Sequence, residues 1–120
     1  MTKHEPMSPA MRERVAAQFK ALAEPSRLLL MGRLFDGRAT VGELVDDSGL
    51  SLANASKHLG LLHDVGWVTR RKQGLTVVYG LADDRTFGLC ELMCARVRAM
   101  ADAEAAATAP AKARPRRRRG

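Results

Sequence analysis

The sequence is poor in aromatic residues and cysteine, and it has no long apolar run. Three Phe, one Trp and one Tyr are present, so a core must be built mainly from Leu, Val, Ala and Met. No apolar run approaches the roughly 20 residues of a membrane-spanning helix, and the first residues lack the apolar segment of a secretory signal. Two cysteines, Cys90 and Cys94, exclude a disulfide framework and are expected to be free thiols. We therefore expect a cytoplasmic protein with no membrane partner.

Positive charge is in excess, with a net formal charge of +7 over 120 residues. Such an excess favours a polyanionic partner such as nucleic acid. Part of it is terminal, because Arg114 and Arg116–Arg119 lie in the last seven residues. We expect a disordered lead (1–7), one domain (8–107) and a disordered Arg-rich tail (108–120). The tail either raises non-specific DNA affinity and its salt dependence or is a solvated segment without a specific role.

Local signals predict three helices before residue 50. Ser8-Pro9 begins the first helix, whose buried stripe is expected to be Val15, Phe19 and Leu22. A second helix restarts at Glu24-Pro25-Ser26, and its segment 28–35 is apolar on nearly all sides, which predicts the buried centre of the domain. The segment 40–43, Thr-Val-Gly-Glu, has the form of a capping box and opens a third helix that closes at Ser48-Gly49.

The segment 50–68 predicts a helix with two different sides. Ser51 is a natural N-cap, and four apolar residues recur at three- and four-residue steps on one side: Leu52, Ala55, Leu59 and Leu62. The other side carries Asn54 and Lys57, with Ser51 and Ser56 near the leading end and His58 on the flank. Short donors and acceptors with one cation suit the DNA major groove. An ordinary amphipathic surface helix is the alternative, and the neighbouring segments decide between them.

The third helix and this one, joined by 49–51, have the form of a helix-turn-helix. Residues 67–72 and 75–81 follow as β-prone runs around Gln73-Gly74, which predicts a hairpin with Gly at a positive-φ position. We expect the core to include Val68, Val77 and Tyr79. Arg70, Arg71 and Lys72 lie just before the tip, as in a DNA-binding wing or, alternatively, a charged edge strand that resists aggregation. A last helix begins near Asp83-Asp84 and runs to about Ala107.

These pieces resemble the ArsR/SmtB family of bacterial winged-helix repressors. The resemblance runs continuously over about 21–81 and includes ALAEPSRLLLMGRL and VGELVDDSGLSLANASKHLGLLHDVGWVTRRKQGLTVVYGL. It implies a mainly α fold with a β-hairpin, a winged helix-turn-helix of order α-α-α-α-β-β-α, and a homodimer formed through the first and last helices. It further implies a repressor that binds a double-stranded DNA operator of dyad symmetry until a ligand or modification weakens binding. The DNA-binding residues carried over are Ser51, Asn54, Ser56, Lys57, His58, Arg70, Arg71 and Lys72.

Some positions depart from the family pattern or allow two roles. Many relatives have Gln at Leu52 and a polar residue at Ala53, so the base preference of this chain is expected to be its own. Arg27 is either a phosphate contact or an ion-pair partner of Glu24. His58 either packs against the third helix or donates to phosphate.

The family's usual metal-sensor patterns are absent. The Cys-x-Cys positions of the arsenic sensors are Thr40 and Gly42 here, and the last helix has no His. No cofactor is expected, with Cys90 and Cys94 as the one effector or redox candidate. At i, i+4 they lie on one side of the last helix. They are either small buried groups of a dimer interface, or thiolate ligands of a soft metal or metalloid, or sites of intersubunit disulfide, persulfide or sulfenic acid formation.

An enzyme is not expected, because the sequence shows no nucleophile-base pattern, no Gly-rich phosphate loop and no paired acids of a plausible site. The remaining alternatives are a winged helix that binds a protein partner and a repressor that responds to no effector. The four cations Lys57, Arg70, Arg71 and Lys72 favour DNA over a protein partner, whose docking face would more often expose apolar anchors.

Overall fold

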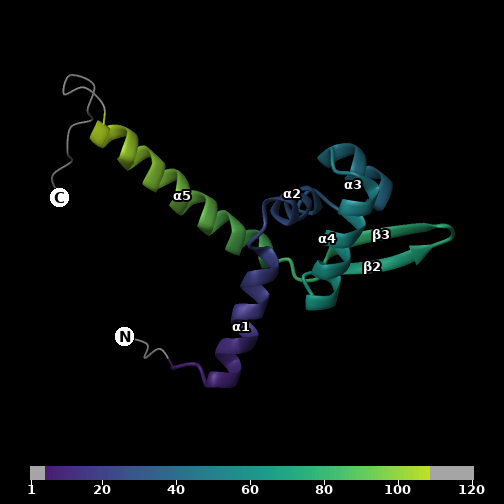
Figure 1. The fold of residues 1–120 in the computed structure, drawn as a ribbon, viewed down its shortest axis with the longest axis horizontal. Helices are drawn as coiled ribbons and strands as arrows, with labels where there is room; N and C mark the ends of the chain where they lie inside the picture. The colour runs from purple at the N-terminus through teal and green to yellow at the C-terminus, as the bar shows by residue number, and fades with distance from the viewer. Residues whose placement is uncertain (1–4, 109–120) are drawn as a thin grey trace. The chain divides into compact units, whose positions relative to one another are not determined.

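The structure is a computed structural model that describes residues 5–108. The chain divides into two units, one up to Asp84 and one from Arg85. Within the described residues, the first unit contains four helices and three strands and the second contains one helix (Figure 1). The elements are α1 (Pro9–Leu22), α2 (Pro25–Leu34), β1 (Ala39–Thr40), α3 (Val41–Ser48), α4 (Leu52–Val65), β2 (Val68–Gln73), β3 (Thr76–Leu81) and α5 (Thr86–Thr108). The predicted mainly helical winged fold and its order are confirmed, with β1 as an addition. The expected Arg-rich tail, from residue 109 on, and residues 1–4 of the expected lead lie outside the described residues.

The added strand β1 was not predicted because two residues carry no alternation that a sequence pattern can reveal. Its pairing with β3 defines it: Ala39 lies opposite Tyr79 and Thr40 opposite Val78. The result is an antiparallel sheet of order β1-β3-β2. Because β1 leads directly into α3, this short pairing anchors the start of the helix-turn-helix to the sheet.

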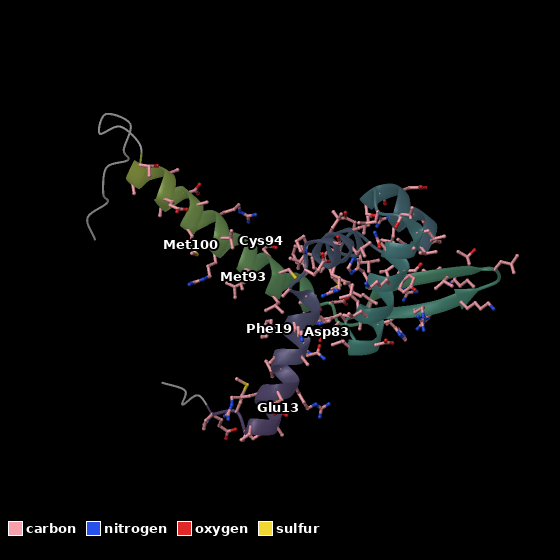
Figure 2. The ribbon with its side chains drawn as sticks, in the orientation of Figure 1. Glu13, Phe19, Asp83, Met93, Cys94 and Met100 are labelled. Carbon is pink, nitrogen blue, oxygen red and sulfur yellow. The ribbon has the colours of Figure 1, made fainter. Side chains whose placement is uncertain are left out.

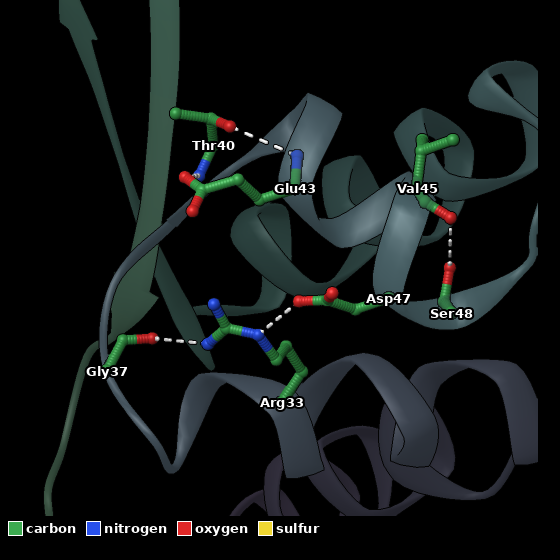
Figure 3. Close-up of polar contacts among 7 residues, drawn as sticks. All are labelled: Arg33, Gly37, Thr40, Glu43, Val45, Asp47 and Ser48. Carbon is green, nitrogen blue, oxygen red and sulfur yellow. Dashed lines mark hydrogen bonds and ion pairs between the residues drawn. The ribbon is translucent and has the colours of Figure 1, made fainter.

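The predicted helix starts are confirmed by their capping hydrogen bonds. The Ser8 and Ser51 hydroxyls accept the backbone N–H groups of Met11 and Asn54, each at 3.1 Å. At α3 the capping box is complete (Figure 3): the Glu43 N–H donates to the Thr40 hydroxyl at 3.1 Å, and the Thr40 N–H donates to the Glu43 carboxylate at 3.0 Å. These bonds satisfy donors that have no partner within the first turn.

The core of the first unit lies between α2, α3, α4 and the sheet. Its largest fully buried side chains are Leu30, Met31, Leu44, Leu59 and Leu62. The prediction that α2 is the buried centre of the domain holds for only one side of the helix. Leu28 and Leu29 are each 48% exposed, because the core covers only the side of α2 that carries Leu30, Met31 and Leu34.

Two further residues expected in the core are exposed. Phe19 is 51% exposed, since the buried residues of α1 are confined to its C-terminal end at Ala21 and Leu22. Leu52 is 59% exposed. Helical side chains tilt toward the helix N-terminus, and the side chain of the first residue of a helix therefore projects past the helix start. The buried side of α4 begins one turn later, at Ala55.

Trp67 and Gln18 fix α1 against the end of α4. The Trp67 indole N–H donates to the Gln18 carbonyl at 3.0 Å, and the Gln18 side-chain amide donates to the Val65 carbonyl at 2.9 Å. Each bond joins residues more than 40 positions apart in sequence. The two bonds therefore set the position of α1 relative to the C-terminal end of α4.

The predicted hairpin is present, with Val68 and Tyr79 buried and Val77 packed against the core. Gln73 pairs with Thr76, so the two turn residues are Gly74 and Leu75 and not the predicted Gln73 and Gly74. Gly74 has a φ of +62°, as predicted, and no described residue other than glycine has a positive φ. A positive φ at the first turn residue alone is the type II′ turn that matches the twist of paired strands.

The second unit is the helix α5, which carries a series of exposed apolar side chains. Figure 2 labels two of them, Met93 and Met100, together with Cys94. The larger set comprises Phe87, Leu89, Leu92, Met93, Val97 and Met100. Among residues 5–108, no helix has the length and apolar character needed to cross a membrane.

Candidate nucleic-acid interface

A tight turn sets α3 and α4 as a helix-turn-helix. Gly49 ends α3 with a φ of +74°, and its N–H donates to the Val45 carbonyl at 3.1 Å. The Ser48 hydroxyl accepts the N–H of Leu50 at 3.2 Å. Ser51 then caps α4. Left-handed backbone at Gly49 is sterically cheap for glycine alone, so this residue fixes where one helix stops and the next begins.

A salt bridge joins α3 to α2 behind this turn (Figure 3). The Arg33 guanidinium donates to the Asp47 carboxylate at 2.5 Å and to the Gly37 carbonyl at 3.4 Å. The hydrogen bond with Asp47 raises the pKa of Arg33. The pair is solvent-accessible, so its role is to orient α3 more than to stabilise the fold.

The leading half of α4 presents the polar surface that the sequence predicted. Ser51, Asn54, Ser56 and Lys57 are exposed, while Ala55 between them is fully buried. The Ser51 hydroxyl accepts from Asn54 N–H and keeps its own proton to donate. The N-terminus of this 14-residue helix also carries the positive end of the helix dipole, which favours phosphate. The surface therefore combines hydrogen-bonding groups with positive potential.

His58 lies at the edge of this surface and contacts α2. Its Nδ1 is 3.3 Å from the Arg27 guanidinium and 3.8 Å from the Glu24 carboxylate. Because arginine has only donors, the contact with Arg27 is a hydrogen bond only where Nδ1 acts as the acceptor. His58 therefore contacts the start of α2, and its two predicted roles, packing against the third helix or donating to phosphate, stay predictions.

Arg27 is used within the fold. Its Nε donates to the Ala21 carbonyl at 2.5 Å, near the end of α1, and a terminal nitrogen contacts His58. Its own backbone N–H donates to the Glu24 carboxylate at 2.9 Å, which caps α2. Arg27 thus connects α1, α2 and α4, and its contact with Glu24 is this backbone cap.

The three wing cations, Arg70, Arg71 and Lys72, are all exposed on β2. Their partners on β3 are Tyr79, Val78 and Val77 respectively. Side chains alternate along a strand, so Arg70 and Lys72 share the sheet face that carries Val68, Tyr79 and Val77, whereas Arg71 lies on the opposite face. The first face is the one that packs on the core with α4. The pleat therefore puts two of the three cations on the same side of the sheet as α4.

The residues with ligand potential do not form a metal centre within the described part of one chain. No group of three or more His, Cys, Asp or Glu side chains is arranged for a metal among residues 5–108. His63 lies in the last turn of α4 with its Nδ1 3.7 Å from its neighbour Asp64. Cys90 is half-buried and Cys94 is exposed. The pKa of Cys90 is raised mainly by its burial and, to a smaller extent, by the nearby Cys94.

Two exposed apolar residues lie at this surface, of which the sequence indicated Leu52, as a departure from the family pattern, and did not indicate Leu75. Leu52 stands at the start of α4 beside Ser51, and Leu75, at the tip of the wing, is fully exposed. Leu52 was predicted to be buried because it shares the helical spacing of Ala55, Leu59 and Leu62. For Leu75 the available signal was its position beside Gly74 in a two-residue turn.

Bacterial repressors are similar to this chain over most of its length. A probable mercury resistance operon repressor of Streptomyces lividans is 38% identical over 81 residues, which is 68% of this chain and 63% of that protein. A biofilm growth-associated repressor of Agrobacterium fabrum is 37% identical over 90 residues, covering 72% of this chain and 77% of the relative. No protein-family model matches the chain.

Solved structures share the fold as well. The homodimeric winged helix-turn-helix DNA-binding domain of a possible ArsR-family regulator from Mycobacterium bovis superposes with a TM-score of 0.67. It is 29% identical and matches 78% of this chain and 90% of the solved domain.

Proposed function

The chain belongs to the ArsR/SmtB family of winged helix-turn-helix transcriptional regulators, and from that premise we propose that it is a homodimeric repressor of sequence-specific action. The observation that carries the proposal is the exposed polar side of α4. This side lies over the capped first two turns of the helix and consists of Ser51, Asn54, Ser56 and Lys57. In this proposal α4 enters the major groove and the β2–β3 wing contacts the adjacent backbone.

The residues have separate roles in the proposed complex. Asn54, with Ser51 and Ser56, supplies hydrogen bonds to base edges and nearby phosphates. Lys57 neutralises a phosphate, and His58 donates from Nε2 while Arg27 holds its Nδ1. Arg70 and Lys72 extend positive charge along the face of the sheet on the side of α4, and Arg71 contributes from the opposite face.

The exposed apolar residues support a dimer. Phe19 and Met11 of α1 are each 51% exposed, and on α5 Leu92 is 70% exposed. Apolar side chains that recur along a whole helix are typical of a surface covered by a partner. A second copy of this chain is the proposed partner, with α1 and α5 in the interface. The relative from Mycobacterium bovis is described as homodimeric.

Selection of operators from random duplex DNA tests this function. We expect enrichment of an inverted repeat whose half-sites are about one helical turn, roughly 10 bp, apart. Analytical ultracentrifugation should give a dimer that binds one duplex. Asn54→Ala and Lys57→Ala should each weaken binding, with Lys20→Ala as a control on α1. Enrichment of no sequence, or binding by a monomer alone, would refute the proposal.

For release from DNA we propose a thiol-reactive agent or a soft metal or metalloid acting at Cys90 and Cys94. The two sulfurs lie on one side of α5, and soft ions prefer thiolates. Two cysteines are fewer ligands than most metal sites use, so a bound ion would draw on both subunits. A change there would alter the spacing of the two recognition helices.

Operator binding in the presence of Zn(II), As(III), peroxide or polysulfide tests the cysteines. The parent is compared with the double variant Cys90→Ser, Cys94→Ser, under reducing conditions before each addition. Release of the parent but not of the double variant would support the sensor and identify its chemistry. If every agent leaves both proteins bound alike, the cysteines are interface residues and the repressor has another effector or none.

A further inference from the structure

We infer that Leu52 recognises the C5-methyl group of a thymine in each operator half-site. This inference rests on the proposed function, because it needs α4 in the major groove. Leu52 is the first residue of α4 and is 59% exposed, between the capping Ser51 and the exposed Ala53 and Asn54. The first turn of a recognition helix is the part that contacts base edges.

The fold gives no reason for leucine at this position. The buried side of α4 starts at Ala55 and continues with Leu59 and Leu62, all fully buried, while Leu52 projects past the helix start. Leucine is no better a helix former than glutamine, lysine or arginine, so helix propensity does not call for an apolar group at this exposed position. An apolar side chain within a surface of serine, asparagine and lysine therefore indicates an apolar contact in the bound state.

Thymine is the base that supplies such a contact. It alone among the four bases carries a methyl group in the major groove, where the other groups are hydrogen-bond donors and acceptors. Leucine has no donor or acceptor, so it cannot read those groups, but it can bury a methyl. The structure thus assigns to Leu52 a choice of base at one position of each half-site, next to the polar contacts of Asn54.

Replacing thymine by deoxyuridine tests the contact, since uracil differs from thymine only by the missing methyl. Each thymine of the selected operator is replaced in turn, symmetrically in both half-sites, and the Kd is measured for the parent and for Leu52→Ala. At one position the parent should bind the uracil operator about 15-fold less tightly. Each buried methyl group contributes about fourfold to the affinity, and the substitution removes one methyl from each of the two half-sites. Leu52→Ala should bind both operators alike.

The ratio of the two Kd values separates this contact from a general loss of binding. Leu28→Ala, which removes a leucine of similar exposure on α2, is the matched control and should keep the parent's ratio. Urea unfolding of Leu52→Ala should match the parent, because little buried area is lost. If the parent binds every uracil operator like its thymine counterpart, or if Leu52→Ala keeps the discrimination, the thymine contact is wrong although the repressor function stands. If the parent selects no operator at all, the proposed function itself fails.

Discussion

Loss of the Lys57 ammonium group should weaken operator binding and flatten its salt dependence together. Lys57 is exposed in the second turn of α4, between the buried Ala55 and Leu59 and therefore turned away from the core. Each phosphate that a protein neutralises contributes about 0.9 to the slope of log K against log salt. Lys57→Ala removes one such contact per subunit, so the slope of a dimer should fall by about 1.8. Between 1 M and 0.15 M salt this amounts to roughly 30-fold in affinity.

Fluorescence anisotropy with the selected operator, at several salt concentrations, measures both quantities. Lys20→Ala is the matched control, because Lys20 lies in the last turn of α1, whose Gln18 contacts the other end of α4. The control should keep the parent's slope. An unchanged slope for Lys57→Ala would refute the phosphate contact, and a loss of affinity without a change of slope would indicate a contact with a base in its place.

Three further predictions concern the wing, the capping box and the thiols. Lys72→Ala should reduce the salt slope more than Arg71→Ala, because β2 places Lys72 on the side of α4, and equal slopes would contradict that assignment. The hydrogen bond from the Thr40 N–H lowers the pKa of the Glu43 carboxyl group. The contribution of this hydrogen bond to stability is therefore present above about pH 4.5 and is lost as the pH falls below that value. Urea unfolding from pH 3 to 7 should therefore show a shallower acid decline for Glu43→Gln, which keeps an acceptor, and identical declines would count against the pair. The raised pKa of Cys90 predicts that its alkylation by iodoacetamide reaches half its maximal rate above about pH 9, the value from which the pKa is raised. Mass spectrometry of the Cys94→Ser variant can measure this midpoint, because burial, the larger cause of the shift, remains in that variant; a lower midpoint would exclude the shift.

Sequence by itself determined the features that depend on neighbouring residues. Ser51 caps α4 and Gly74 turns the hairpin because capping and positive φ are local requirements that few residue types meet. The capping box of Thr40 and Glu43 is local for the same reason. These features give the order of the elements and the exposed surface of α4, while the family was indicated by the resemblance of the residues from about 21 to 81.

Only the tertiary structure decided which side of each element meets the core. Periodicity placed Leu52 and Phe19 inside, yet both are exposed, because the core covers α4 only from Ala55 on and α1 only at its end. The pairing of β2 with β3 likewise separated Arg71 from its neighbours. The contact of His58 with Arg27 joins residues 31 positions apart, which no local pattern can specify. Burial depends on what packs opposite, and that partner is set by the whole chain.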